Sequence, residues 1–238
     1  MSGEEQKPTV YLVPTPIAAG AVQALPPEVL KHTAALTHYF AEDLRTARRL
    51  IKALHPQMVI EQLSFAEMSN NVPPDKQLFR KWIAAGHSIG IMSEAGCPGI
   101  ADPGAELVAL AHGMGVKVLP LTGPSSIILS LMASGLNGQS FAFNGYLPVK
   151  EPLRSKRIKE LELRSAKEQQ TQAFIETPYR NNNLLADLLK NCAAGTRLCI
   201  ALDISGEKEF IRTHSIADWK KAPPHLEKAP AVFLLLGA

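Results

Sequence analysis

The sequence contains little cysteine, which limits the disulfide and metal chemistry to expect. Its three cysteines, Cys97, Cys192 and Cys199, cannot all pair, and none belongs to a C-x-x-C motif. The seven histidines also lack the spacing of metal ligands. We therefore predict a protein of a reducing compartment, the cytoplasm, and no metal site.

Long hydrophobic runs and a strong excess of charge are also missing. The longest apolar-rich segment, around 126–136, is interrupted by serine and is too short to cross a bilayer. The first eight residues are polar and acidic, which predicts that no signal peptide is present. A net charge of +3 says little about partners. We expect a soluble protein that does not bind membranes.

What the sequence does contain is an alternation of short apolar runs and helical patterns. Its 238 residues, 46% of them hydrophobic, suffice for one large domain or two smaller ones. The pattern predicts an α/β fold. Strands are expected at 9–13, 35–40, 59–63, 89–92, 116–119, 172–176, 197–203, 209–214 and 231–236, and helices at 27–31, 73–85, 127–134, 150–170 and 181–191.

The segment 89–126 carries the strongest signal for a ligand site. Each of its two expected strands runs into a turn rich in glycine, proline and serine, and a helix follows each turn. The first helix is expected to start with Asp102 as its N-cap and Pro103 in its first turn. In open α/β sheets ligands bind at the carboxyl ends of the strands. Two ordinary turns would have the same composition, so a purely structural role stays open.

The motifs of this segment resemble those of a known superfamily. The runs S-E-A-G-C-P-G-I-A-D-P-G and P-L-T-G-P-S-S are similar to the S-D-A-G-T-P-x-I-x-D-P-G and P-x-P-G-P signatures of the tetrapyrrole methylases. Within that superfamily the chain looks most like the ribosomal small-subunit RNA methyltransferase I family. Those enzymes use S-adenosylmethionine (SAM) to methylate a cytidine ribose 2′-hydroxyl of 16S rRNA. Further similar motifs are V-P-T-P-I, A-E-D-L-R, F-A-F-N-G-Y-L-P and F-I-E-T-P-Y-R.

The resemblance implies two α/β domains, placed at 1–121 and 122–238, with SAM in the cleft between them. It also implies a homodimer whose partner is 16S rRNA or the small ribosomal subunit. By motif position, SAM is expected against Pro16, Glu94, Gly99, Ser125, Ser126, Ile127, Phe174 and Ala229. The candidates for proton transfer or substrate positioning are Glu42, Asp43, Arg45, Glu176 and Arg180. Structural ion pairing is the alternative role for these charged residues.

Several departures from the family pattern leave other functions open. The family's H-N-E segment is absent from 64–71, its R-E-L-T-K is replaced at 202–206, and Glu94 stands in place of an aspartate. The alternatives are a tetrapyrrole methyltransferase of the precorrin type and a SAM-binding protein without catalytic activity.

Two predicted helices are rich in basic residues. The helix after Asp43 carries basic side chains on the face opposite its apolar positions, which fits either a solvated face or an RNA phosphate-binding face. The helix expected at 150–170 mixes both signs of charge, which favours a solvated face. The basic residues of the first helix are Arg45, Arg48, Arg49 and Lys52.

Overall fold

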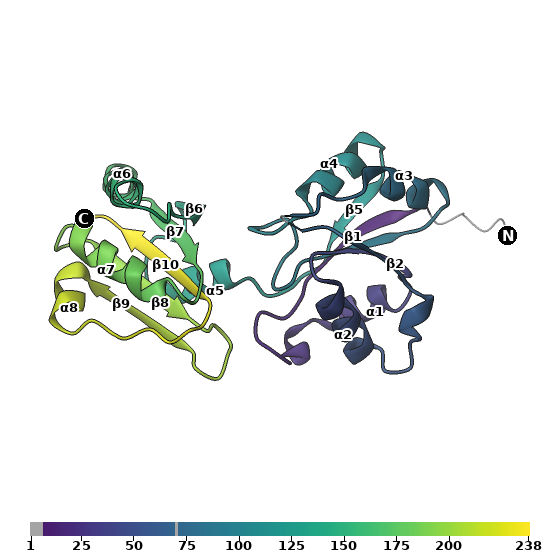
Figure 1. The fold of residues 1–238 in the computed structure, drawn as a ribbon, viewed down its shortest axis with the longest axis horizontal. Coiled ribbons are helices and arrows are strands. Elements are labelled where there is room, and N and C mark those ends of the chain that lie inside the picture. Colours follow the sequence, from purple (N-terminus) through teal and green to yellow (C-terminus); the bar gives the residue numbers. More distant parts are fainter. Residues whose placement is uncertain (1–6, 70) are drawn as a thin grey trace. The chain divides into compact units, whose positions relative to one another are not determined.

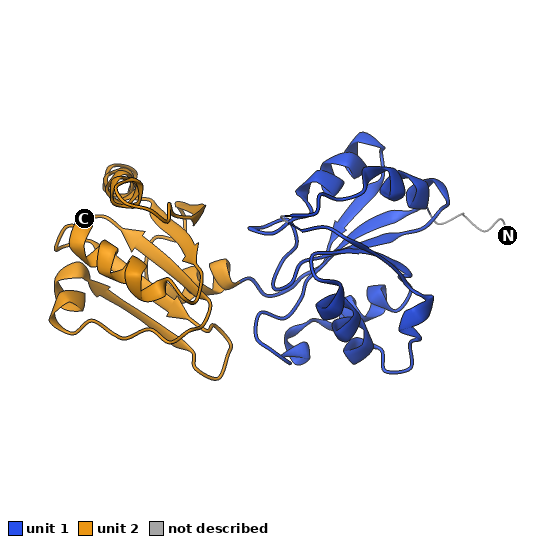
Figure 2. Cartoon of the chain, viewed as in Figure 1, with its two compact units in different colours: residues 1–125 blue, residues 126–238 orange. Residues whose placement is uncertain are grey.

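The computed structural model of the chain describes residues 7–69 and 71–238, so the expectations for residues 1–6 and for Asn70 lie outside the described part. The chain divides into two compact units, residues 1–125 and 126–238 (Figure 2). This boundary lies between Ser125 and Ser126, where the sequence predicts one after residue 121. Both units combine a five-stranded sheet with helices, and the predicted α/β class is confirmed.

Unit 1 is built on a sheet in the order β3-β2-β4-β1-β5, in which all neighbouring strands are parallel (Figure 1). Its helices cover both faces, α1 and α2 on one and α3 and α4 on the other. All strand carboxyl ends therefore meet at one edge. The elements are β1 (Thr9–Val13), η1 (Val22–Ala24), α1 (Pro27–Thr33), β2 (His38–Ala41), α2 (Leu44–Leu54), η2 (Ile60–Gln62), β3 (Ser64–Glu67), α3 (Lys76–Ala84), β4 (Ile89–Met92), α4 (Ala105–Gly113) and β5 (Lys117–Pro120).

The two faces of this sheet bury separate apolar clusters, because successive side chains of a strand point to opposite sides. In β2, Tyr39 packs with α1 and α2, while Phe40 packs with α3 and α4. Gly90 in β4 makes room for the Tyr39 ring, since a Cβ there would lie 2.7 Å from Cδ1 of that ring. Burial raises the pKa of the Tyr39 phenol.

Unit 2 contains a mixed sheet in the order β6-β7-β10-β8-β9, parallel only between β6 and β7 (Figure 1). Helices α6, α7 and α8 enclose the apolar core of this unit, and α5 packs against β8, β9 and β10. The elements are α5 (Ser126–Ser134), β6 (Phe141–Tyr146), α6 (Leu153–Glu168), β7 (Thr171–Glu176), α7 (Asn181–Asn191), β8 (Arg197–Leu202), β9 (Phe210–Ser215), α8 (Ile216–Lys221) and β10 (Ala231–Leu236).

Two local expectations are wrong. The segment 59–63 is not a strand: it forms the short helix η2, Val59 is 49% exposed, and the strand follows as β3. Asp102 is not a helix cap, because α4 begins only at Ala105. Gly104 precedes α4 with a φ of 128°, a backbone conformation that glycine adopts without strain, and this places Asp102 inside the preceding turn.

Each unit contains one of the two tryptophans of the sequence. In unit 1, the rings of Trp82 and His38 pack edge to face, with their centroids 4.7 Å apart. The His38 ring also stacks on the His87 ring, at a centroid distance of 4.0 Å. In unit 2, the buried Trp219 donates a hydrogen bond from Nε1 to the carbonyl of Leu198 at 2.9 Å. Both indoles thus belong to the packing of their own unit.

Candidate functional site at the strand ends of unit 1

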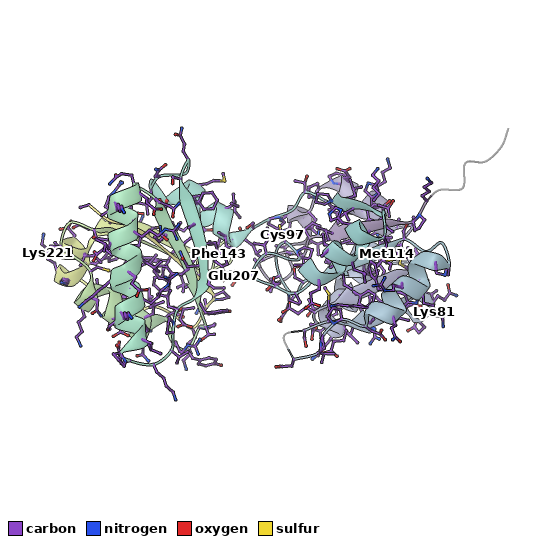
Figure 3. The ribbon with its side chains drawn as sticks, turned by 90° about the horizontal axis from the view of Figure 1, so that it is seen from above. Lys81, Cys97, Met114, Phe143, Glu207 and Lys221 are labelled. Atoms are coloured by element: carbon purple, nitrogen blue, oxygen red, sulfur yellow. The ribbon has the colours of Figure 1, made fainter. Side chains whose placement is uncertain are left out.

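The loops that follow β1, β4 and β5 are joined to one another at the carboxyl edge of the sheet. Thr15 and Gly96 exchange two backbone hydrogen bonds, of 2.9 and 3.0 Å. The thiol of Cys97 donates to the carbonyl of Pro124 at 3.4 Å. Cys97 lies in the loop after β4, at the end of the unit opposite Lys81 of α3 (Figure 3). The two motifs of the sequence therefore form one connected surface.

Glycines allow these loops to pack closely. A Cβ on Gly123 would lie only 2.1 Å from the Cβ of Pro14, so no larger residue fits there without moving the β1 loop. Gly96 and Gly99 have φ angles of 75° and 81°, which other residues adopt only with strain. The backbone at this edge therefore depends on glycine at these three positions.

Three carboxylates gather at the same edge. One carboxylate oxygen of Glu42, which follows β2, accepts a hydrogen bond of 2.9 Å from the backbone N–H of Glu94, which follows β4. Burial raises the pKa of Asp102 to about 7, and the charges of Glu42 and Glu94 contribute, against a hydrogen bond from Ser93. Among the described residues, no ion pair includes any of the three carboxylates. The edge therefore carries negative charge without a compensating cation.

Asp102 was missed as a site residue. Its place in the D-P-G motif was visible, but the D-P pair also fits a helix start, and the sequence does not show that Glu42 and Glu94 lie near it. Burial and the Asp102 charge also raise the pKa of the Cys97 thiol, so this thiol stays protonated at neutral pH.

Asp43 and Arg45 begin the helix that leaves this edge. Asp43 accepts a hydrogen bond of 2.6 Å from the backbone N–H of Thr46, which makes it the N-cap of α2. This bond lowers the pKa of Asp43. Arg45 is exposed on the first turn of the same helix. Asp43 thus has a structural role, while Arg45 is accessible to a ligand.

Glu176 and Arg180 lie together at the end of β7 in unit 2. The buried Glu176 accepts hydrogen bonds at Oε1 from Arg180 Nη2 at 2.6 Å, Arg180 Nε at 2.8 Å and the Thr177 N–H at 2.6 Å. The hydrogen bonds to Glu176 raise the pKa of Arg180. Near this pair, the buried acceptors Glu176 Oε2 and Asn181 Oδ1 have no hydrogen-bond partner among the described residues. The Glu176–Arg180 contact is therefore an ion pair of the kind expected for a structural role, and the second carboxylate oxygen of Glu176 takes no part in it.

The predicted SAM-contacting residues fall in both units. Those of unit 1 lie in the joined loops, whereas Ser126 and Ile127 open α5 in unit 2. Phe174 is 1% exposed and stacks on Phe233 at a centroid distance of 6.0 Å, so its side chain belongs to the core of unit 2. The carbonyl of Ala229 accepts a hydrogen bond of 2.8 Å from Asn181. The unit 1 residues are Pro16, Glu94, Gly99 and Ser125.

Two features are absent from the described residues. Within 7–69 and 71–238, no group of three or more histidine, cysteine, aspartate or glutamate side chains is arranged to hold a metal ion. Over the same ranges, no helix combines the length and apolar composition needed to span a bilayer.

Comparison with known proteins identifies relatives along nearly the whole chain. It is 32% identical over 233 residues to "Ribosomal RNA small subunit methyltransferase I" of Vibrio cholerae, covering 97% of this chain and 77% of the relative. It is 30% identical to the protein of the same name from Pseudomonas aeruginosa, covering 96% and 79%. No model of a protein family matches.

A solved structure shows the same fold. The uroporphyrin-III-C-methyltransferase from Thermus thermophilus aligns with a TM-score of 0.53 and 17% identity, covering 97% of this chain and 92% of that one. The predicted tetrapyrrole methylase fold is thereby confirmed. Because identity to the curated relatives reaches 32% over nearly the full length, the chain belongs to the ribosomal RNA small subunit methyltransferase I family.

Proposed function

We propose that this methyltransferase transfers the methyl group of SAM to a ribose 2′-hydroxyl of 16S rRNA. One observation carries the proposal. In a chain that is 32% identical to a protein named as a small-subunit rRNA methyltransferase, the two resembling motifs meet at one sheet edge through the contact between Cys97 and Pro124. That edge is where open parallel sheets bind ligands.

The residues at this edge fit a sulfonium cofactor. SAM carries a positive charge on sulfur, and within residues 7–69 and 71–238 the carboxylates of Glu42, Glu94 and Asp102 form no ion pair. When bound, SAM supplies an activated methyl group. We propose that the unit 1 residues Pro16, Glu94, Gly99 and Ser125 hold it, together with Ser126, Ile127 and Ala229 of unit 2.

The chain must also receive a proton, because the ribose hydroxyl loses one as its oxygen forms the new bond to carbon. Asp102 suits this role, since a carboxyl with a pKa of about 7 is both ionised and basic to a useful extent at neutral pH. Glu42 supports it by holding the backbone of Glu94 at 2.9 Å. We assign substrate positioning to Arg45 and Arg180, the latter oriented by Glu176.

The proposal is tested by transfer of a labelled methyl group from SAM to small ribosomal subunits from a source strain that lacks this gene. We expect label at a single ribose of the 16S rRNA. Subunits from the parent strain are the control, because their site already carries the methyl group. If both preparations stay unlabelled while SAM binds, the RNA assignment is overturned. The same protein would then be assayed with porphyrinogen acceptors, and failure there would indicate SAM binding without catalysis.

Homodimer assembly and a cytoplasmic location complete the proposal. Both rest on the resemblance to the family. Sedimentation velocity of the purified chain tests the first, with a mass of twice 25.8 kDa expected.

A further inference from the structure

Helix α2 presents four basic side chains on one side. Arg45, Arg48, Arg49 and Lys52 follow the spacing i, i+3, i+4 and i+7, which places them on one helical face, and all four are exposed. We call them the α2 basic face. In the described part of the chain, none of the four forms an ion pair. Their charges are therefore available to an external anion.

The arginines of helix α6, in contrast, are paired with carboxylates. Each of its arginines has a carboxylate partner: Arg164 pairs with Glu168 at 3.1 Å, Arg157 with Glu160 at 3.5 Å, and Arg154 with Asp187. The expected solvated face of this helix agrees with those pairs. The two basic helices of the sequence thus differ in whether their arginines are neutralised.

The contacts of the α2 basic face also suit phosphate binding. The Arg48 guanidinium lies over the ring of Phe65, 5.3 Å from its centroid. A guanidinium that stacks through its plane keeps the N–H groups on its rim free for oxygen acceptors. The ammonium of Lys52 donates to the carbonyl of Met58 at 3.0 Å, which holds it in place and leaves further donors.

The position of α2 connects this face to the site. The helix begins at Leu44, directly after Glu42 and Asp43 at the carboxyl edge of the sheet. From Arg45 to Lys52 it rises about 10 Å. Four cations spread over that length exceed what one small anion can use, whereas a polynucleotide backbone offers successive phosphates.

We propose that the α2 basic face binds the phosphate backbone of the RNA substrate and directs it to the carboxyl edge of unit 1. This inference rests on the proposed function, and it adds the surface that holds the RNA. Arg45, next to the edge, would contact the phosphate nearest the reacting ribose, and Arg48, Arg49 and Lys52 would contact those that follow.

The test compares two triple variants of the full chain that remove the same charge. The first is Arg48→Gln, Arg49→Gln and Lys52→Gln, which leaves Arg45 intact. The control is Lys156→Gln, Lys159→Gln and Lys167→Gln on α6, three exposed lysines that form no ion pair with the described residues. Affinity for protein-free 16S rRNA and for small subunits is measured at several salt concentrations, SAM affinity by calorimetry, and folding by circular dichroism.

We expect the α2 triple to bind RNA at least tenfold more weakly and to lower the slope of log affinity against log salt by about 2, at ~0.7 per lost contact. SAM affinity should be unchanged, and the α6 triple should stay within about twofold of wild type. If the α2 triple melts early, Arg49→Gln alone replaces it, because the exposed Arg49 side chain, unlike Arg48 and Lys52, forms no hydrogen bond or ring contact with the described residues.

Equal losses in both triples would overturn the inference, as would an unchanged α2 triple. A loss confined to intact subunits would overturn it too, because it would identify a ribosomal protein as the partner. Wild-type protein that neither binds nor methylates RNA would instead overturn the proposed function, so the two failures are distinguishable.

Discussion

Carboxylates stand at strand ends in both units, but their surroundings differ. In unit 2, Glu176 is buried with Arg180, whose Nη2 lies 2.6 Å from its Oε1. In unit 1, burial and the charges of Glu42 and Glu94 raise the pKa of Asp102 to about 7, and no cation among the described residues pairs with it. A carboxylate that pairs with an arginine of its own turn stabilises that turn. Neighbouring carboxylates without a cation repel one another, which destabilises the folded state. We infer that unit 1 tolerates this cost in order to receive a cation and a proton from its ligands.

The largest expected effect is on the unit 2 side of this comparison. Glu176→Ala leaves Arg180 and the Thr177 N–H without their acceptor, and we expect the free energy of unfolding to fall by about 3 kcal/mol. Urea unfolding followed by circular dichroism measures it. Glu160→Ala is the control, because its pair with Arg157 is exposed and should contribute less than about 0.5 kcal/mol. If Glu176→Ala kept full stability and lost only methyl transfer, Glu176 would be a ligand-binding group and the contrast would disappear.

The next effect is on catalysis at the unit 1 edge. Asp102→Asn removes the proposed proton acceptor and should slow methyl transfer at pH 7 by about 100-fold, the scale of general base catalysis. Wild-type activity should rise with pH around 7 as the carboxyl ionises. A variant that kept both the rate and the pH dependence would remove Asp102 from the mechanism. Glu61→Gln is the matched control, because Glu61 is exposed and pairs with no cation in the described part of the chain.

The Asp102→Asn substitution should also change stability. We expect it to raise the free energy of unfolding, by a smaller amount than it raises the catalytic barrier. A carboxyl whose folded pKa lies above its unfolded value of about 4 binds more protons in the folded state, so stability falls as pH rises from about 4 to 7. Asp102→Asn removes this loss. We expect the variant to be more stable than wild type by roughly 1 kcal/mol at pH 8, after allowing for the partial exposure of the group. Thermal unfolding at pH 5 and 8 would show the gain only at the higher pH.

The smallest effect concerns the opposite edge of the same sheet. Burial, with a contribution from His87, lowers the pKa of His38. A histidine with a lowered folded pKa stabilises the protein above about pH 6.5, and this stabilisation is lost as pH falls below that value. His38→Gln should reduce the loss at pH 5.5 by roughly 0.3 kcal/mol, since exposure screens most of the shift. A thermal melt series is the measurement. If the variant lost as much stability between pH 7 and pH 5.5 as wild type does, His38 would not contribute to this loss.

Elements with strong local signals were predictable from the sequence. The strands 9–13, 89–92 and 231–236 have the predicted bounds, because each is an apolar run closed by proline, glycine or serine turns. The prediction of a strand at 59–63 is wrong because its apolar residues belong to the short helix η2 before β3: Val59 is exposed, and Ile60 and Leu63 pack against the core. The edge strand β3 alternates poorly, and its position depends on pairing with β2.

The site was predictable in its position but not in its electrostatics. Glycine-rich turns and the family motifs located the carboxyl edge. The hydrogen bond from Glu94 to Glu42 joins residues 52 positions apart, so no local pattern could show it. The raised pKa of Asp102 depends on that same tertiary proximity. Likewise, the sequence could not show that the arginines of α6 form ion pairs and those of α2 do not, because this depends on which residues lie next to each helix in the fold.

The distribution of tryptophan gives each unit an intrinsic fluorescent reporter. Trp219 is buried and should emit at short wavelength, whereas Trp82 is only half-buried beside His38. Trp82→Phe therefore leaves an emission spectrum that arises from unit 2 alone, and Trp219→Phe leaves one from unit 1. Intensity changes on adding RNA or denaturant can then be assigned to one half of the chain without an attached dye.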